Sequence, residues 1–439
     1  MTARSDLAGA AVLGLVVVAV VVAAEAWARL GSPRPEWTRK LVHTGGGVAC
    51  LLFPFFIRSP LLVFGMAAAL SLAFVLGGRG GWLRSLHRVE RPTHGAEYYP
   101  VAISLLFLLA RDQPWLYVSS VLVLAVADAL AALVGGQYGT LTFEVQDERK
   151  SVEGSIAFFL ATFLAVHLPT LLMTDLPRAT CVLSATLAAL LLTGLEIVCL
   201  RGTDNLFLPL ASFLVLSRMT TQPLSNLVLH NLGLLALTAV LFVVLSRVRL
   251  FNPGGAVTFL LFSYATWALG SLAWAAPVFA GFAAYTLGRR FTPGLALGPH
   301  RVRTMTRALL PPLLVLILAN STRSYALLFG PYLAASAAVL AFALRPEAAR
   351  WAPRMLAAAL VTVVVLTWPL HRGSLAALVT VMLAATIAVV FEPLLVRLTP
   401  AFEPRAEWSA GRFLMSLAAA ALVLAAQAGG VPQMWGVTE

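Results

Sequence analysis

The sequence predicts an all-α integral membrane protein, a polytopic helical bundle of about 14–16 transmembrane helices. Three observations predict this class: 60% of the 439 residues are hydrophobic, only 11% are charged, and the mean hydropathy is +0.88. Because soluble globular proteins contain about 25% charged residues, this composition excludes them. The first apolar run, at about residues 7–28, lacks the cleavage site of a signal peptide, so we expect it to be the first span.

Apolar runs of about 17–25 residues recur along the chain and predict the other spans. The run in the middle of the first half contains an aspartate, Asp128, and two short runs lie near residues 104 and 212. Residues 255–288 are expected to form two spans rather than one. The expected spans are centred at about residues 18, 49, 68, 104, 125, 163, 189, 212, 235, 262, 280, 313, 333, 362, 384 and 419.

The net charge of +12 is explained by membrane topology rather than by nucleic-acid binding, because the basic residues are spread through the short loops between spans. When the loops are assigned alternately to two sides, most of the 31 Lys and Arg residues fall on one side. The positive-inside rule makes that side cytoplasmic, so both termini are predicted to lie outside. We expect a multi-pass protein (of the cytoplasmic membrane, in a bacterium) with its active site at the cytoplasmic face.

Acidic residues are concentrated in the first half of the chain, and none occurs between Asp204 and Glu347. Metal-dependent chemistry needs carboxylates as ligands, and several acids of the first half border or enter apolar runs. We therefore predict a catalytic membrane domain over residues 1–222 and a second transmembrane helical region, with no assigned role, over residues 223–439.

The first candidate segment is Arg39-Lys40-Leu41-Val42-His43, at the mouth of the second span. On a helix Arg39, Lys40 and His43 share one face, which suits either a phosphate contact or a positive-inside anchor.

The second segment, residues 94–100, places Glu97 at the start of a span. A carboxylate there is explained by the helix dipole alone.

The third segment begins at Asp128, which lies in an apolar helix. An ionised carboxylate there costs a few kcal/mol and needs a partner, a metal or a function. Ala132, Gly135 and Gly139 follow at spacings that form a bare helical stripe. The stripe permits close approach either by another helix or by the phosphates of a ligand.

Lys150 is one of only two lysines in the chain, the other being Lys40, and it precedes a predicted helix. Ser151 is a candidate N-cap of that helix and Glu153 lies in its first turn, so capping explains both. Capping does not explain Lys150, because a cation is unfavourable at a helix N-terminus. A bound phosphate would resolve the conflict, since helix N-termini bind anions.

The fourth segment runs from Glu196, a second intramembrane carboxylate, to Asp204, which is either a helix N-cap or a functional acid. The predicted topology brings all four segments to the same face. Carboxylates to hold Mg²⁺, cations to neutralise phosphate oxygens and a base for a hydroxyl are the requirements of metal-assisted phosphoryl transfer.

Taken in order, these motifs resemble the CTP-dependent lipid-alcohol kinases, a family that comprises dolichol (polyprenol) kinase, phytol kinase and the fungal-type diacylglycerol kinase. The resemblance covers roughly residues 36–216. The family's Arg-Lys-x-x-His is matched by Arg39, Lys40 and His43, and its Lys-Ser-x-Glu-Gly-Ser by Lys150, Ser151, Glu153, Gly154 and Ser155. Its Asp-x-x-Ala-x-x-x-Gly-x-x-x-Gly is matched by Asp128, Ala131, Gly135 and Gly139, with Ala127 in place of the usual preceding glycine.

The remaining motifs match less fully. Residues 95–100 approximate Gly-Glu-x-x-Tyr-Pro, with Ala96 inserted before Glu97. A late Glu and an Asp-Asn-x-x-x-Pro segment are matched by Glu196, Asp204, Asn205 and Pro209. The order of Asp helix, glycines and Lys-x-x-Glu-Gly also looks like phosphatidate cytidylyltransferase, which uses CTP to form CDP-diacylglycerol.

The resemblance implies a membrane lipid kinase that transfers the γ-phosphate of CTP to an isoprenoid alcohol, with Mg²⁺ as cofactor. It implies that Asp128, Glu196 and Asp204 hold the metal, and that His43 or Glu153 accepts the hydroxyl proton. The nucleotide would be bound by Arg39, Lys40, Gly135, Gly139, Lys150, Ser151 and Gly154. The alternatives are the cytidylyltransferase and a non-enzymatic transporter, since buried acids also occur in transporters.

Overall fold

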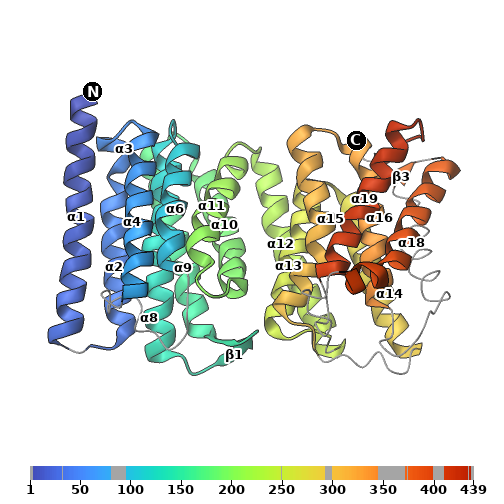
Figure 1. Cartoon of the computed structure of the whole chain (residues 1–439), viewed down its shortest axis with the longest axis horizontal. Helices are drawn as coiled ribbons and strands as arrows, with labels where there is room; N and C mark the ends of the chain where they lie inside the picture. Colours follow the sequence, from blue (N-terminus) through green and yellow to red (C-terminus); the bar gives the residue numbers. More distant parts are fainter. Residues whose placement is uncertain are drawn as a thin grey trace. The chain divides into compact units, whose positions relative to one another are not determined.

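The computed structural model describes residues 3–31, 33–80, 95–248, 250–291, 299–344, 371–372, 374–398, 410–433 and 435–436. These residues are almost entirely helical, which confirms the predicted all-α class (Figure 1). Nine of the described helices are long and apolar enough to cross a membrane, and three shorter apolar helices accompany them. Every expected span within these ranges coincides with helical structure. The span expected near residue 362, and His94, lie outside the described residues.

The chain divides into two compact units, Met1–Gly233 and Leu234–Glu439. The division falls inside helix α12 (Leu224–Val248). All the candidate site residues belong to the first unit, and the assignment of catalysis to residues 1–222 stays a prediction.

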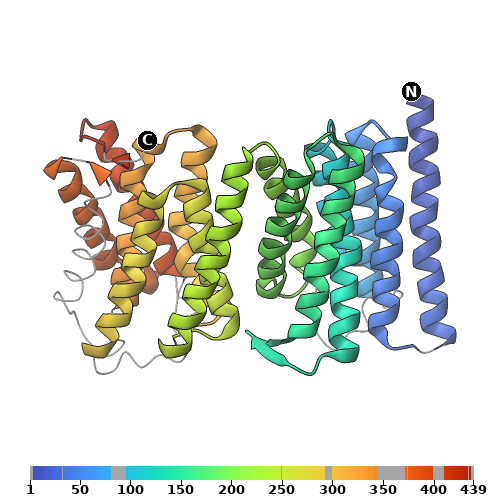
Figure 2. The same cartoon turned by 180° about the vertical axis from the view of Figure 1, so that it is seen from behind.

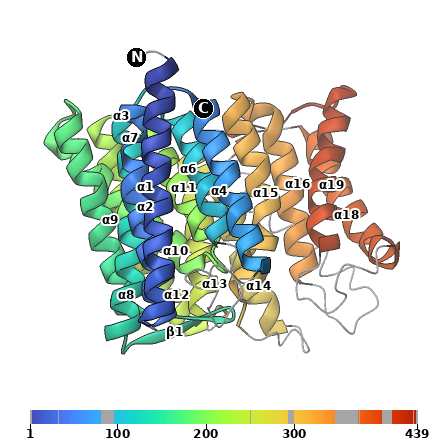
Figure 3. The same cartoon turned by 60° about the vertical axis from the view of Figure 1, so that its left-hand side comes forward.

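The first unit is a bundle of helices with one small hairpin. Neighbouring pairs include α1 with α2, α4 with α6, and α8 with α9, as Figures 2 and 3 show from two further sides. Its elements are α1 (Ala3–Leu30), α2 (Pro35–Leu51), α3 (Phe53–Phe56), α4 (Pro60–Gly80), α6 (Gly95–Leu109), α7 (Pro114–Leu122), the π-turn η1 (Val123–Ala127), α8 (Asp128–Tyr138), β1 (Thr142–Val145), β2 (Glu148–Ser151), α9 (Val152–Met173), α10 (Arg178–Val198) and α11 (Asp204–Met219).

The core of this unit is built around the continuous span Pro114–Tyr138, which comprises α7, η1 and α8. Leu116, Val121 and Leu124 of this span are almost fully buried, and they belong to one cluster with Leu106 of α6 and Phe158 of α9. The span is therefore surrounded by protein for much of its length, which places Asp128 inside the bundle rather than against lipid.

The two strands β1 and β2 form an antiparallel hairpin, with Thr142 opposite Ser151, between α8 and α9. The sequence analysis did not predict these strands, because the segment is polar and short. The backbone N–H of Arg201, in the loop between α10 and α11, donates to Glu148 Oε1 at 2.9 Å. This contact fixes the hairpin against the end of α10 and so sets the position of Lys150.

The second unit is also helical, and its most buried helix is α16 (Tyr325–Ala343). Tyr332, Leu333 and Ala335 of α16 are fully buried in the principal core of this unit. Its other elements are α13 (Pro253–Leu269), α14 (Leu272–Phe291), α15 (Val302–Thr322), β3 (His371–Arg372), α18 (Leu375–Leu398), α19 (Ala410–Ala428) and β4 (Trp435–Gly436). The separate helices α13 and α14 agree with the expected division of residues 255–288.

Candidate active site

A buried ion pair joins α2 to the middle of the Pro114–Tyr138 span. Lys40 Nζ lies 2.5 Å from Asp128 Oδ2, and the two side chains are 6% and 8% exposed. Lys40 Nζ also lies 3.4 Å from the backbone carbonyl oxygen of Asp128. The partner that the sequence analysis required for a carboxylate in an apolar helix is therefore Lys40.

His43, one turn further along α2, contacts the same aspartate. Its Nε2 lies 3.3 Å from Asp128 Oδ2 and 2.7 Å from the carbonyl oxygen of Leu124. A carbonyl can only accept a hydrogen bond, so Nε2 carries the hydrogen. The Nδ1 atom of neutral His43 is then the ring nitrogen with a free lone pair.

The π-turn η1 explains why the Leu124 carbonyl is accessible. The N–H of Asp128 bonds to the carbonyl of Val123, five residues back rather than four. The return to α-helical bonding after such a turn leaves one carbonyl without a donor inside its own helix, and π-turns are frequent at functional sites for this reason. His43 Nε2–H occupies this carbonyl, and the Thr44 hydroxyl donates to the next one, that of Ala125, at 3.1 Å.

Lys150 forms the second buried ion pair of the site. Its Nζ lies 2.6 Å from Glu196 Oε1 and 2.5 Å from the Glu196 carbonyl oxygen, in the last turn of α10. Burial alone would lower the pKa of Lys150, but the Glu196 carboxylate outweighs this effect and raises the pKa above the usual lysine value. The ammonium group of Lys150, which is unfavourable at the start of α9, thus lies at the C-terminus of α10, where a cation is favourable.

Asp204 is close enough to both ion pairs to interact with their charges. It interacts electrostatically with Asp128, Lys150, Lys40 and Glu196, and its buried Oδ1 accepts no hydrogen bond from any described residue. It is the first residue of α11, and Thr203 is the N-cap, so the alternative reading of Asp204 as an N-cap is wrong.

The three carboxylates expected to hold a metal do not form a ready-made metal site. Within the described ranges, no group of three or more His, Cys, Asp or Glu side chains is arranged to hold a metal ion. Asp128 and Glu196 each have one oxygen paired with a lysine, whereas Asp204 offers an unpaired buried oxygen. The donor types suit Mg²⁺, but full coordination requires the lysines to give up their carboxylates.

A polar cavity of about 430 Å³ opens beside Asp128, Lys150 and Glu196. Its remaining lining comes from the small residues of α8 and from the hairpin: Ala131, Ala132, Gly135, Gly136, Gly139, Thr140, Thr142, Arg149, Ser151, Gly154 and Ser155. At Gly139 a Cβ atom would lie 2.3 Å from the Gly135 carbonyl oxygen and 2.8 Å from Ser151 Cβ. The small-residue stripe thus packs α8 against the start of α9 and also lines the polar cavity, and its contact with the phosphates of a ligand stays a prediction.

Ser151 and Glu153 both organise the border of this cavity. Ser151 is the N-cap of α9, and its Oγ accepts from the Gly154 N–H at 3.1 Å, as predicted. Glu153 Oε1 accepts from the backbone N–H groups of Thr140 and Leu141 at 2.8 and 3.0 Å and from the Thr140 hydroxyl. Glu153 therefore holds the turn between α8 and β1, and it does not itself line the cavity.

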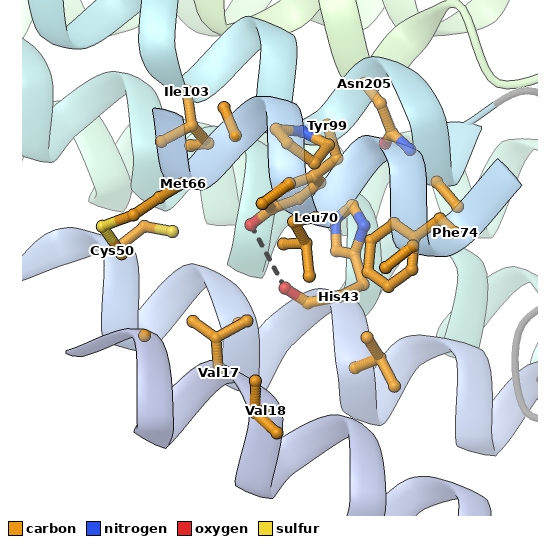
Figure 4. Close-up of a pocket in the computed structure, with 18 of the residues that line it drawn as sticks. Val17, Val18, His43, Cys50, Met66, Leu70, Phe74, Tyr99, Ile103 and Asn205 are labelled. Carbon is orange, nitrogen blue, oxygen red and sulfur yellow. Dashed lines mark hydrogen bonds between the residues drawn. The ribbon is translucent and has the colours of Figure 1, made fainter. Parts of the chain in front are cut away.

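A second cavity, of about 360 Å³, lies between α1, α2, α4 and α6 and is mostly apolar (Figure 4). Three polar residues, Arg39, His43 and Asn205, contribute to its lining. The apolar lining consists of Gly14, Val17, Val18, Val42, Gly46, Cys50, Phe53, Val63, Met66, Ala67, Ala69, Leu70, Ala73, Phe74, Gly95, Ala96, Tyr99, Pro100 and Ile103. Because His43 lines this cavity and Asp128 lines the polar one, the 3.3 Å contact between them joins the two.

Sequence reasoning missed the polar supports of the apolar cavity. The Tyr99 hydroxyl donates to the His43 carbonyl oxygen at 3.2 Å, and Asn205 Nδ2 donates to the Gly95 carbonyl oxygen at 2.8 Å. Tyr99 belongs to the segment 95–100 and Asn205 to the Asp-Asn-x-x-x-Pro segment. Nothing else in the sequence indicated a role for either residue. Arg39 forms an ion pair with Glu36 at 2.6 Å and lines the apolar cavity, not the polar one expected for a phosphate contact.

The fold and the site together define a polytopic helical membrane protein in which a polar, lysine-containing cavity adjoins an apolar one. Over 200 residues the chain is 34% identical to phytol kinase of Synechocystis sp., a match that covers 45% of this chain and 85% of that protein. The chain therefore belongs to the lipid-alcohol kinase family that includes phytol kinase. No family model matches the sequence, and no solved structure matches it.

The Lys40–Asp128 pair generates a prediction about stability. In Lys40→Met the aspartate is left buried without its partner, and we expect a loss of about 3–5 kcal/mol in the free energy of unfolding, because an uncompensated buried charge is costly. The double variant Lys40→Met/Asp128→Leu removes both charges and should recover most of this loss. Thermal unfolding of the purified protein in detergent measures both. Equal destabilisation by the single and double variants would contradict the pairing.

Proposed function

We propose that this protein transfers the γ-phosphate of CTP to the hydroxyl of an isoprenoid alcohol of the phytol or polyprenol type. The alcohol oxygen forms a bond to the γ-phosphorus, the bond from that phosphorus to the β–γ bridging oxygen breaks, and CDP leaves. Similarity to phytol kinase supports the reaction class, and the motif resemblance supports CTP as the donor.

The observation that carries the proposal is the contact between His43 and Asp128. A lipid alcohol needs an apolar space and a nucleotide needs a polar one, and the two must meet at the reacting atoms. Here His43 belongs to the apolar cavity and Asp128 to the polar one, 3.3 Å apart. In this arrangement the nucleotide phosphates lie beside Lys150 and the small residues of α8, and the alcohol hydroxyl lies beside His43.

His43 is the better candidate for the group that accepts the hydroxyl proton. Its Nε2–H is held by the Leu124 carbonyl, and this leaves Nδ1 free to accept a proton. Glu153, the other candidate, already accepts three hydrogen bonds from Thr140 and Leu141 on one oxygen. We therefore assign Glu153 a positioning role in the turn that borders the polar cavity.

In this proposal Mg²⁺ would be held by the carboxylates of Asp128, Glu196 and Asp204 once the nucleotide is bound. The unpaired buried oxygen of Asp204 is the observation that most favours a cation there. When bound, the metal would neutralise charge on the transferred phosphate. Lys40 and Lys150 would then move from carboxylate to phosphate oxygens, a change that compact, flexible ammonium groups permit.

Labelled CTP tests the reaction. We expect purified protein with Mg²⁺ to transfer the γ-label to phytol or to a polyprenol, and Asp128→Asn to abolish the transfer, because the variant weakens a proposed metal ligand and removes the charge that faces Lys40 and His43. Transfer of the α-label to phosphatidate would instead identify a cytidylyltransferase. If neither label moves to any lipid, the proposal fails.

Kinetics of two variants distinguish the proposed roles of His43 and Glu153. His43→Gln should lower kcat by about 10²–10⁴-fold, the range for loss of a general base, with little change in KM for CTP. Glu153→Gln should mainly raise KM for CTP, because the turn at Thr140 loosens. Steady-state rates at varied CTP concentration give both constants. The opposite pattern would make Glu153 the base.

Metal binding tests the exchange of lysine partners. In the absence of nucleotide we expect weak Mn²⁺ binding, because Lys40 and Lys150 occupy the carboxylates. A non-hydrolysable CTP analogue should increase the Mn²⁺ affinity at least tenfold, and Lys150→Met should increase the nucleotide-free affinity. Electron paramagnetic resonance of free Mn²⁺ measures both. Arg149→Gln, which keeps Lys150, is the matched control. Tight nucleotide-independent binding by the unaltered protein would refute the exchange.

A further inference from the structure

The apolar cavity has a polar end and a closed apolar end. His43 and Asn205 lie toward one end, together with Phe74, and Cys50, Met66 and Ile103 lie toward the other (Figure 4). Most side chains at the apolar end are buried: Cys50, Phe53, Val63 and Ile103 are 8%, 4%, 1% and 3% exposed, and Met66 is half-buried. That end therefore stops inside protein rather than opening to lipid.

The side of the cavity is less enclosed than its apolar end. Val18 of α1 lines the cavity and is 52% exposed, and Ala69 of α4 is also exposed. A lipid chain in the bilayer can thus reach the cavity laterally between these two helices, with its hydroxyl directed to His43.

The length of the cavity follows from helix geometry. Val63 and Phe74 of α4 line its two ends, and at 1.5 Å per residue they are separated by about 16 Å along the helix. A staggered hydrocarbon chain advances about 1.25 Å per carbon–carbon bond, so this length holds about 13 bonds, or three to four isoprene units.

We infer that the length of this cavity limits the chain length of the alcohol substrate. Its closed end, formed by Phe53, Val63 and Cys50, selects isoprenoid alcohols of farnesol to phytol length over dolichol-length polyprenols. The inference rests on the proposed function and adds the substrate class to it. A chain that fits is buried to its end and gains from every apolar contact. A much longer chain must leave through the open side, and it loses the contacts at the closed end.

The test is phosphoryl transfer from labelled CTP to the series geraniol, farnesol, geranylgeraniol, solanesol and dolichol, with phytol alongside. For the full-length protein, kcat/KM should rise up to geranylgeraniol and phytol and fall at least tenfold for solanesol and dolichol. No transfer to any alcohol would overturn the proposed function itself. Equal transfer to geranylgeraniol, solanesol and dolichol would preserve the kinase and overturn only the chain-length selection.

Two variants with opposite effects locate the closed end. Phe53→Ala opens it and should raise the ratio of solanesol to geranylgeraniol activity at least fivefold. Cys50→Phe adds a ring there and should move the optimum to farnesol or geraniol. Phe56→Ala, on the next turn and 49% exposed outside the cavity, is the matched control and should leave the profile unchanged. Thermal unfolding verifies folding, and if Phe53→Ala does not fold, the shift in Cys50→Phe decides. An unchanged profile in a folded Phe53→Ala or Cys50→Phe protein overturns the inference.

Discussion

The buried pair of Lys40 and Asp128 is the interaction on which the rest of the site depends. A carboxylate inside an apolar span is costly unless it is paired, so α2 must lie where its lysine reaches Asp128. The same interface includes the Thr44 bond to the Ala125 carbonyl. It also includes Gly47, where a Cβ atom would lie 2.2 Å from Ala125 Cβ. The ion pair, the π-turn and the close approach at Gly47 thus belong to one helix contact, which joins the two cavities.

Two lysines in a chain that otherwise uses arginine have a common explanation. Each is buried against one carboxylate, Lys40 against Asp128 and Lys150 against Glu196, so these buried charges cancel in the ligand-free protein. Burial requires such cancellation. The proposed nucleotide and metal would change that balance, and in the proposal the lysines then change partners. An ammonium group is a compact point charge on a flexible stem, whereas the planar fork of arginine favours a fixed bidentate partner.

The sequence predicted the fold class and the positions of the described spans, because each of these leaves a local trace. It also marked the four residues of the two ion pairs as candidates, whereas Arg39 lies in the other cavity. An aspartate in an apolar run needs a partner wherever it lies, and Ser151 before a helix is a cap in any fold. The pairing itself was not predictable: nothing in the sequence joins Lys40 to Asp128 or Lys150 to Glu196, because both contacts depend on how distant helices pack. The π-turn could not be predicted either, because the apolar sequence Val123–Ala127 is typical of an ordinary α-helix. Lys150 shows the limit most clearly, because its position before α9 suggested an anion at that helix, and the structure gives it the end of α10 instead.

The distribution of charge around α2 explains why a histidine, and not a carboxylate, adjoins the apolar cavity. The ionised groups Asp128, Lys150 and Glu196 line the polar cavity, where water or phosphate can solvate them. On the apolar side the group proposed to contact the reacting hydroxyl is His43, whose neutral ring is far less costly to bury among aliphatic side chains than an ionised acid would be. In the proposed reaction the imidazolium that forms is stabilised by Asp128, whose Oδ2 lies 3.3 Å from the other ring nitrogen, Nε2. A carboxylate in the place of His43 would stand beside Asp128 as a like charge, and one of the two would have to be protonated. In the proposed reaction, α2 thus separates an apolar cavity from a polar one, and its histidine accepts the proton where the two meet.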